Sequence, residues 1–239
     1  MREGGLILAA IMERLKGIIK CGVTTGEIDS LAEDLIRQEK ALPAFKGYRD
    51  YPAATCISTN FEVVHGIPGR RKLEEGDIIS IDLGLSYKDY FSDAAFTVGI
   101  GKIDSKAKKL IEMTWESLNE GIKAAQPDNR LGDISSAIQR YIEKNGFSVV
   151  RQFVGHGIGA NLHEEPELPN FGRPGTGEIL KPGMVLAIEP MVNMGTWECE
   201  ILEDGWTAVT CDKKLSAHFE HTVAITENGP EILTKMYSK

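Results

Sequence analysis

Two stretches of the chain, LEEGDIISID at Leu73–Asp82 and LKPGMVLAIE at Leu180–Glu189, align residue by residue. In each, a glycine turn precedes a run of apolar and β-branched residues, which predicts a buried β-strand. Each run ends in an acid, Asp82 or Glu189. A buried carboxylate is costly unless it is paired, hydrogen-bonded or bound to a metal. The two stretches therefore predict related strands that carry acids into the interior.

A second pair of matching segments supports an internal duplication. Gly26–Ser30 reads GEIDS and Gly132–Ser136 reads GDISS, and each opens a segment with apolar residues at the spacing of one buried helix face. Thr24 and Glu27 have the spacing of a capping box, which predicts where the first of these helices begins. A further helical stretch precedes each one, at Leu6–Lys20 and Lys106–Ala125. The helix pair and the strand pair match at nearly the same offset along the chain.

The duplication predicts one domain over residues 1–239, with an internal repeat of roughly 1–100 and 105–225. No linker rich in proline, glycine or serine separates the halves. The expected fold class is α/β in an α+β arrangement, with pseudo-two-fold halves, curved antiparallel strands inside and helices outside. Asp82 and Glu189 would then occupy equivalent places at the seam between the halves, where sites often form.

The composition is typical of a soluble globular protein. Of the 239 residues, 42% are hydrophobic and 26% are charged. The net charge of −8 argues against DNA or another nucleic acid as a partner, although Arg70–Lys72 could form a local basic patch. The four cysteines lack a C-x-x-C pair, so we expect neither a thiolate zinc site nor a disulfide framework. No apolar stretch approaches the roughly 20 residues that span a bilayer, and we expect a cytoplasmic protein without membrane contact.

Five residues that could hold a metal lie within or beside apolar runs: Asp82, Asp93, His156, Glu189 and Glu220. A tight turn at the middle of Ser86–Asp89 would place Asp82 and Asp93 face to face across an antiparallel pair. Like charges so placed repel, and a dication between them removes the repulsion. Either aspartate alone is better explained without a metal, Asp93 as an exposed edge residue and Asp82 as a strand-end cap. The four acids together favour a metal site.

The histidines give weaker signals one at a time. His156 stands in VGHGIG, where three glycines would let the backbone approach a ligand closely, although a lone histidine beside glycine is more often a turn residue. His65 and His163 each precede a proline by three residues, in the segments HGIP and HEEP. His218 and His221 flank the last acid, and because side chains alternate along a strand we expect both to be non-ligands.

One imidazole and four carboxylates favour a borderline to hard dication, Mn, Fe, Co or Zn, over ions that prefer thiolates. Two such ions can share a bridging carboxylate. A pair of ions would lower the pKa of a bridging water towards ~7 and supply hydroxide at neutral pH. The residues therefore predict a metal centre that activates water.

Six stretches carry a family resemblance: Gly155–Gly159 (GHGIG), His163–Pro166 (HEEP), Ala187–Met191 (AIEPM), Phe219–Thr222 (FEHT), Cys56–Ser58 (CIS) and His65–Pro68 (HGIP). Together they closely resemble methionine aminopeptidase of type I. The likeness covers essentially the whole chain in order, and the combined motifs are highly specific. It implies the pita-bread fold of that family and hydrolysis that removes the N-terminal methionine when the second residue is small.

The resemblance also implies a role for each matching metal ligand. Asp82 would bind one ion, and Asp93 and Glu220 would bridge both ions. His156 and Glu189 would complete the coordination of the other ion. Glu189 would also handle the proton of the attacking water.

The same resemblance implies a substrate site. His65 and His163 would contact the substrate, with His163 placed to stabilise the tetrahedral intermediate. Four residues match the walls of the family's methionine pocket: Tyr48, Tyr51, Cys56 and Trp206. Phe45 and Leu162 depart from the pattern, because familiar bacterial members carry cysteine and phenylalanine there. Simple core packing is the alternative explanation for these aromatic residues.

Two other functional classes fit the same fold. A proline-specific peptidase, such as Xaa-Pro aminopeptidase or prolidase, usually brings an additional N-terminal domain, for which 239 residues leave no room. A non-catalytic pita-bread protein, or a metal-free hydrolase of the creatinase kind, would lack one or more of the acids. We therefore expect a monomeric aminopeptidase that acts on the N-terminal peptides of nascent proteins, with the ribosome as a candidate partner.

Overall fold

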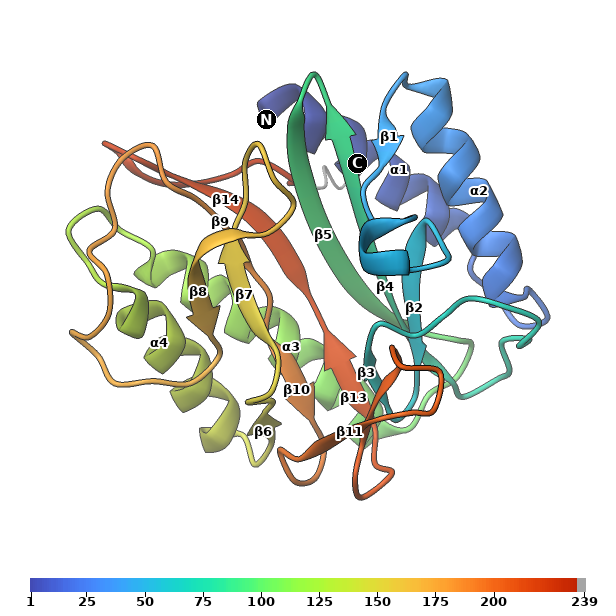
Figure 1. Ribbon diagram of the computed structural model, residues 1–239. Helices are drawn as coiled ribbons and strands as arrows, with labels where there is room; N and C mark the ends of the chain where they lie inside the picture. Colours follow the sequence, from blue (N-terminus) through green and yellow to red (C-terminus); the bar gives the residue numbers. More distant parts are fainter. Residues whose placement is uncertain (236–239) are drawn as a thin grey trace.

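Long helices cover the outer side of a curved sheet in the computed structural model, which describes residues 1–235 (Figure 1). The helices are α1 (Arg2–Ile18), α2 (Thr25–Gln38), α3 (Ser105–Ala124) and α4 (Leu131–Lys144). α1 packs on strands from the first part of the chain and α4 on strands from the second. The helices therefore leave the inner, concave side of the sheet free for a site.

The main sheet has nine strands, all paired antiparallel. Its central path runs β1 (Leu42–Pro43), β4 (Ile78–Tyr87), β5 (Tyr90–Gly99), β14 (Glu220–Thr226), β9 (Val185–Ile188), β7 (Val154–Gly157) and β8 (Glu164–Pro169). Two further strands pair with this path, β2 (Thr55–Thr59) with β4 and β15 (Gly229–Ile232) with β14. The middle of the sheet is thus the β5–β14 pair, which joins two strands that are distant in the sequence.

Two small sheets frame the main one. The first contains β13 (Ser216–His218), β10 (Met191–Asn193) and β6 (Ser148–Val149). The second contains β11 (Cys199–Ile201), β12 (Ala208–Thr210) and β3 (Glu62–Val64). β13 ends one residue before β14 begins, so the chain passes from a small sheet to the centre of the large one at Phe219.

The helix predictions are confirmed, with small shifts at the ends. The side chain of Thr24 accepts from the amide of Glu27, and Glu27 accepts from the amide of Thr24, which makes the expected capping box. α1 begins at Arg2 rather than Leu6 because the helix runs through two glycines. At the second of them, Gly5, a Cβ would clash with the carbonyl of Leu233, so the glycine lets α1 pack against the end of the chain.

The β5–β14 pair has one of the two matched strands on each side. β4 and β9, which carry the matched sequences, flank this pair at equivalent distances in the sheet. The acids on β4 and β9 therefore lie one strand away from the central pair on each side. The duplication and the single-domain boundary stay predictions.

A transmembrane segment was not expected from the sequence. Within residues 1–235, every helix is too short or too polar to cross a bilayer.

Candidate metal centre and substrate pocket

Three acids share one face of the central strands. Asp82 on β4 and Glu220 on β14 are both cross-strand partners of Ala95 on β5, so the three residues form one row. Asp93 lies two residues before Ala95, and side chains two apart along a strand share a face. Because the alanine between the acids has only a methyl group, the row leaves space for their carboxylates.

The predicted face-to-face pairing of Asp82 and Asp93 is wrong by one step of register. β4 and β5 turn at Lys88–Asp89, whose two residues have φ values of 51° and 64°. Asp82 is therefore opposite Ala95, and Asp93 is opposite Gly84. A shift of the turn centre by one residue changes the pairing by two, so the aspartates become diagonal neighbours and keep their common face.

The other two candidate ligands come from β7 and from the residue that follows β9. His156 pairs with Ala187, which also pairs with Thr222, two residues after Glu220. Glu189 follows two residues after Ala187, and its Oε1 lies 3.5 Å from Nε2 of His156. Nδ1 of His156 is 2.8 Å from a backbone carbonyl, which can only accept, so this nitrogen donates. In a neutral ring Nε2 then keeps a lone pair for a metal.

The glycines beside His156 serve the neighbouring strands. A Cβ at Gly155 would clash with the carbonyl of Ala187, and one at Gly157 would clash with the carbonyl of Glu165. Because side chains alternate, both positions face away from the carboxylates. The two glycines let β7 lie close between β8 and β9, and close approach of the backbone to a ligand stays a prediction.

Burial makes this cluster costly as a set of bare charges. Asp93 and Glu220 are 4% and 2% exposed. Burial raises the pKa of Asp93 to about 7. Burial, reinforced by the neighbouring acids, also raises the pKa of Glu220, and likewise that of Asp82 and Glu189, well above the usual range.

The residues present fit a divalent cation. Ligand atoms of Asp93, His156 and Glu220 lie within 4.8 Å of one another. One oxygen each of Asp82, Asp93 and Glu220 is buried with no hydrogen-bond partner among residues 1–235. Buried acceptors in a native protein normally have partners. Surplus negative charge, unpartnered oxygens and an imidazole lone pair are the donor set that a borderline or hard cation needs.

A cavity of about 140 Å³ lies over the cluster. Its walls include all the predicted site residues: Asp82, Asp93, His156, Glu189, Glu220, His65, His163, Tyr48, Tyr51, Cys56 and Trp206. The structure therefore brings the expected ligands and the expected substrate contacts to one place. Arg49 also lines the cavity and was missed, because a lone arginine in a polar turn gives no sequence signal.

Phe45 and Leu162, the two residues that depart from the expected pocket pattern, lie in the same wall of the cavity. Phe45 and Leu162 line the cavity and pack in one apolar cluster with Tyr51 and Cys56. A Cβ at Gly84 would lie 2.7 Å from Cε1 of Phe45, so the glycine makes room for this ring. Phe45 and Leu162 thus belong to one continuous apolar surface in the cavity wall.

His65 and His163 both line the cavity, and His65 is the more buried of the two. Rings of Phe153 and Trp206 meet His65 edge-on, with centroids at 5.4 and 6.2 Å. The ring of His163 lies 4.2 Å from that of His156. Burial lowers the pKa of His65 and of His163 to about 4. Both rings are therefore neutral at pH 7 and can each donate one N–H.

His218 lies closer to the cluster than the alternation argument suggested. Its Nε2 is 3.6 Å from Oε2 of Glu189 and is buried with no hydrogen-bond partner in the described part of the chain. His221 faces the other way, as expected, because its Nδ1 is 2.9 Å from Oγ1 of Thr234 and its ring meets Trp115. The sequence signal for His218 was its spacing of two residues from Glu220, which predicts a shared face.

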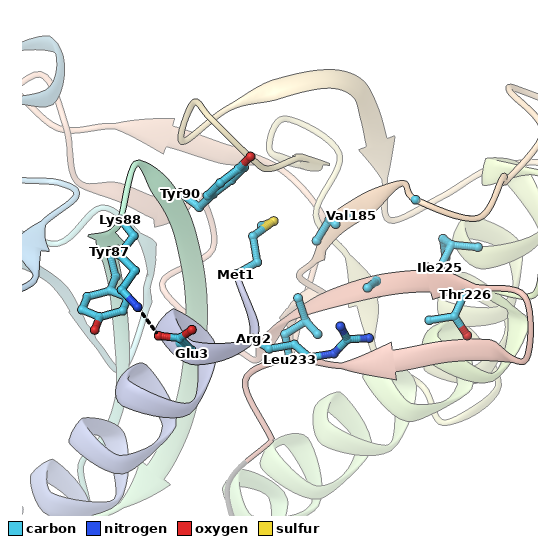
Figure 2. Close-up of a pocket in the computed structure, with 12 residues that line it drawn as sticks. Met1, Arg2, Glu3, Tyr87, Lys88, Tyr90, Val185, Ile225, Thr226 and Leu233 are labelled. Atoms are coloured by element: carbon cyan, nitrogen blue, oxygen red, sulfur yellow. Dashed lines mark hydrogen bonds and ion pairs between the residues drawn. The ribbon is translucent and has the colours of Figure 1, made fainter.

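A larger cavity, of about 740 Å³, lies beside the start of α1 (Figure 2). Figure 2 shows Met1, Tyr90 and Val185 around it, and a 2.7 Å ion pair between Glu3 and Lys88 at its edge. Among the described residues that line it there is no histidine, and its one carboxylate is the paired Glu3. Size alone therefore does not mark the reactive site.

Comparisons with known proteins agree with this geometry. The model of metallopeptidase family M24 matches residues 1–227. The methionine aminopeptidase of Clostridium perfringens is 57% identical over 98% of this chain and 94% of its own length. The crystal structure of methionine aminopeptidase from Thermotoga maritima has a TM-score of 0.97 and 48% identity, covering 98% of this chain and 95% of that one.

A more distant neighbour separates fold from family. Prolidase from Pyrococcus horikoshii has a TM-score of 0.80 and 25% identity, covering 100% of this chain but 61% of the prolidase chain. Both structural neighbours have the pita-bread fold, which confirms the expected fold class. Identity and coverage are much higher for the aminopeptidases. The chain therefore belongs to metallopeptidase family M24, a family of hydrolases, and within it to the methionine aminopeptidases.

Proposed function

We propose that the protein hydrolyses the first peptide bond of newly made polypeptides, releasing methionine with the help of two divalent cations when the second residue is small. One observation carries this proposal. Four acids and an imidazole face one small cavity, and three of the acids hold buried oxygens that no described residue satisfies. Family membership supports the choice of reaction.

The same ligand roles that the resemblance implied are the ones we propose. Five residues would hold the cations: Asp82 would serve one, His156 and Glu189 the other, and Asp93 and Glu220 both. The mixed nitrogen and oxygen donors favour Mn, Fe, Co or Zn. When bound, the cations supply Lewis-acid polarisation of the scissile carbonyl and hydroxide at neutral pH.

The chain's own groups handle protons and charge. Glu189 accepts the proton of the attacking water. His163, a neutral donor, hydrogen-bonds the carbonyl oxygen as negative charge develops there. His65 also contacts the substrate. Glu189 then returns the proton to the leaving amine.

The apolar part of the cavity wall would hold the methionine side chain. Tyr51, Cys56 and Trp206 surround it, with ring centroids of Tyr51 and Trp206 5.0 Å apart. Phe45 and Leu162 complete the wall. Polarisable and aromatic surfaces suit a thioether.

The metal requirement is tested by dialysis against a chelator, followed by assay before and after addition of Mn or Co. Cleavage of Met-Ala-Ser is expected to disappear and then return. Full activity in metal-free protein would reject the proposal.

The substrate is tested by comparing Met-Ala-Ser with Met-Leu-Ser and with an Xaa-Pro peptide. We expect Met-Ala-Ser to be cleaved faster than Met-Leu-Ser, because its second residue is smaller. The Xaa-Pro peptide should be cleaved very little. Preference for the Xaa-Pro peptide would replace methionine removal by a prolidase-type activity.

A cytoplasmic location, a monomeric state and contact with ribosomes stay predictions from the sequence. Light scattering of the purified protein tests the monomer, and co-sedimentation with ribosomes tests the contact.

A further inference from the structure

Tyr48 lies on a short turn whose backbone is held in one conformation. The turn η1 (Tyr48–Asp50) follows Gly47, and Gly47, Arg49 and Asp50 have positive φ values of 86°, 48° and 70°. Such conformations are costly for residues other than glycine and persist where the surroundings fix them. The amide of Gly47 donates to the carbonyl of Tyr51 at 2.8 Å, which closes the turn. Tyr48 is therefore presented from a fixed position.

The side chain of Tyr48 contacts His163 in two ways. Oη of Tyr48 lies 3.0 Å from Nδ1 of His163, and the rings stack with centroids 5.2 Å apart at 28°. The guanidinium of Arg49 lies 5.4 Å from the centre of the Tyr48 ring. On another side, the His163 ring is 4.2 Å from that of His156. These contacts restrict how the His163 ring can turn.

The position of one proton decides what His163 can do. A neutral imidazole carries a single N–H, so one nitrogen donates and the other accepts. Because Nδ1 faces Tyr48, Nε2 is the nitrogen left to meet a substrate. A phenol hydroxyl can donate to an imidazole nitrogen. A proton held on Nε2 is what donation to a carbonyl oxygen requires.

We propose that Tyr48 is a positioning residue for His163: its hydroxyl donates to Nδ1 and so keeps the proton on Nε2, aimed at the carbonyl of the scissile bond. This inference rests on the proposed function, which gives His163 that substrate contact. It assigns the hydroxyl of Tyr48 a task beyond the pocket wall that the family resemblance implied.

Tyr48→Phe separates the two roles, because it removes the hydroxyl and keeps the ring. If Tyr48 is only a wall, phenylalanine preserves kcat, and any effect falls on KM. If Tyr48 positions His163, an interaction specific to the transition state weakens, and kcat falls while KM is kept.

The direct test is the tautomer of His163, measured by long-range 15N–1H NMR in metal-free and Zn-loaded protein. The chain has five histidines, so His163→Gln identifies the resonance by its loss. Wild-type protein is expected to show the Nε2–H form, and Tyr48→Phe to show a shift towards the Nδ1–H form. An Nδ1–H form in wild-type protein, or identical spectra for both proteins, would overturn the proposal.

Kinetics with Met-Ala-Ser give the second readout. For Tyr48→Phe, kcat is expected to fall about 10-fold, with KM changed by less than about 2-fold and metal affinity unchanged. Tyr141→Phe on α4, outside the cavity lining, makes the same chemical change as a control and should have wild-type kinetics. Wild-type kcat in Tyr48→Phe would contradict the positioning role. If the wild-type protein fails to cleave Met-Ala-Ser with every metal, the proposed function fails, whereas the tautomer result stands independently.

Discussion

Asp93 shows how a reactive site and a stable fold make opposing demands on one residue. Its backbone is fixed to β14, because its amide donates to Oγ1 of Thr222 and its carbonyl accepts from the same hydroxyl, at 2.9 and 2.7 Å. Its side-chain Oδ1 is nevertheless buried without a partner in residues 1–235. The residue is thus held rigidly in a place that is unfavourable for a bare carboxylate and favourable for a cation ligand.

Asp93→Asn is expected to stabilise the metal-free protein while weakening metal binding. Removing a buried charge relieves the repulsion from Asp82 and Glu189. Thermal unfolding at about pH 8 with chelator should show a higher Tm, and calorimetry should show Mn affinity lower by at least about 10-fold. Asp34→Asn, an exposed acid on α2, is the control and should change neither. A lower Tm for metal-free Asp93→Asn would contradict this account.

His218→Leu tests whether the buried imidazole beside Glu189 serves the site. An unsatisfied buried polar atom costs about 1–3 kcal/mol, so leucine of similar size should not lower the Tm of the metal-free protein. Activity should fall several-fold, because Oε2 of Glu189 loses the imidazole that faces it at 3.6 Å. Unchanged kcat together with a lower Tm would show that His218 is only a packing residue.

At the scale of the element, local patterns predicted the helices well and the strand pairing less well. The capping box at Thr24 and the apolar spacing fixed α2, since both depend on residues close in sequence. The predicted β4–β5 register was wrong by one step, because the register depends on which two residues adopt positive φ at the turn. The shared face of the acids survived this error because alternation has a period of two. His218 was expected to lie away from the acids, and this was wrong. It is the last residue of β13, where the chain passes from a small sheet to the main one.

Gly84→Ala is expected to narrow the cavity that we propose as the methionine pocket. The added methyl would lie 2.7 Å from Cε1 of Phe45 and 3.1 Å from Cβ of Ala44, so the phenylalanine ring must move into the cavity. KM for Met-Ala-Ser should rise several-fold, with a stability loss of about 1–3 kcal/mol from overpacking. Phe45→Cys in the same chain should restore KM. A Gly84→Ala enzyme with wild-type KM would show that Phe45 does not shape the pocket.

At the scale of the whole molecule, the sequence motifs predicted which residues meet but not the shape of the place where they meet. All five proposed ligands line one cavity, since their strands are joined by the sheet order. The size of the cavity and the presence of Arg49 depend on loops that pack from distant parts of the chain. Such contacts leave no periodic signal in the sequence.

The stability of the metal-free protein should depend on pH in a way set by the site. Because burial raises the pKa of the acids, that of Asp93 to about 7, the native state holds protons that the unfolded chain has released. Stability is therefore expected to rise as pH falls from about 8.5 to about 7. Burial lowers the pKa of His65 and His163 from 6.5 to about 4, so the unfolded chain takes up protons first below about pH 6.5. The rise should flatten there.

Denaturant titrations at several pH values, with chelator or with saturating Mn, measure this dependence. Bound Mn should abolish the slope between about pH 7 and 8.5, because the acids then stay deprotonated in the native state. If the metal-free protein has the same free energy of unfolding at about pH 7 and about pH 8.5, the pKa values of the acids are not raised by burial.

The central place of β14 has a consequence for how each new copy of the protein matures. A chain that ends before residue 220 lacks the strand between β5 and β9, so both would present open edges and Glu220 would be absent. A growing chain therefore cannot assemble the complete cluster of acids until the segment that forms β14 has been synthesised.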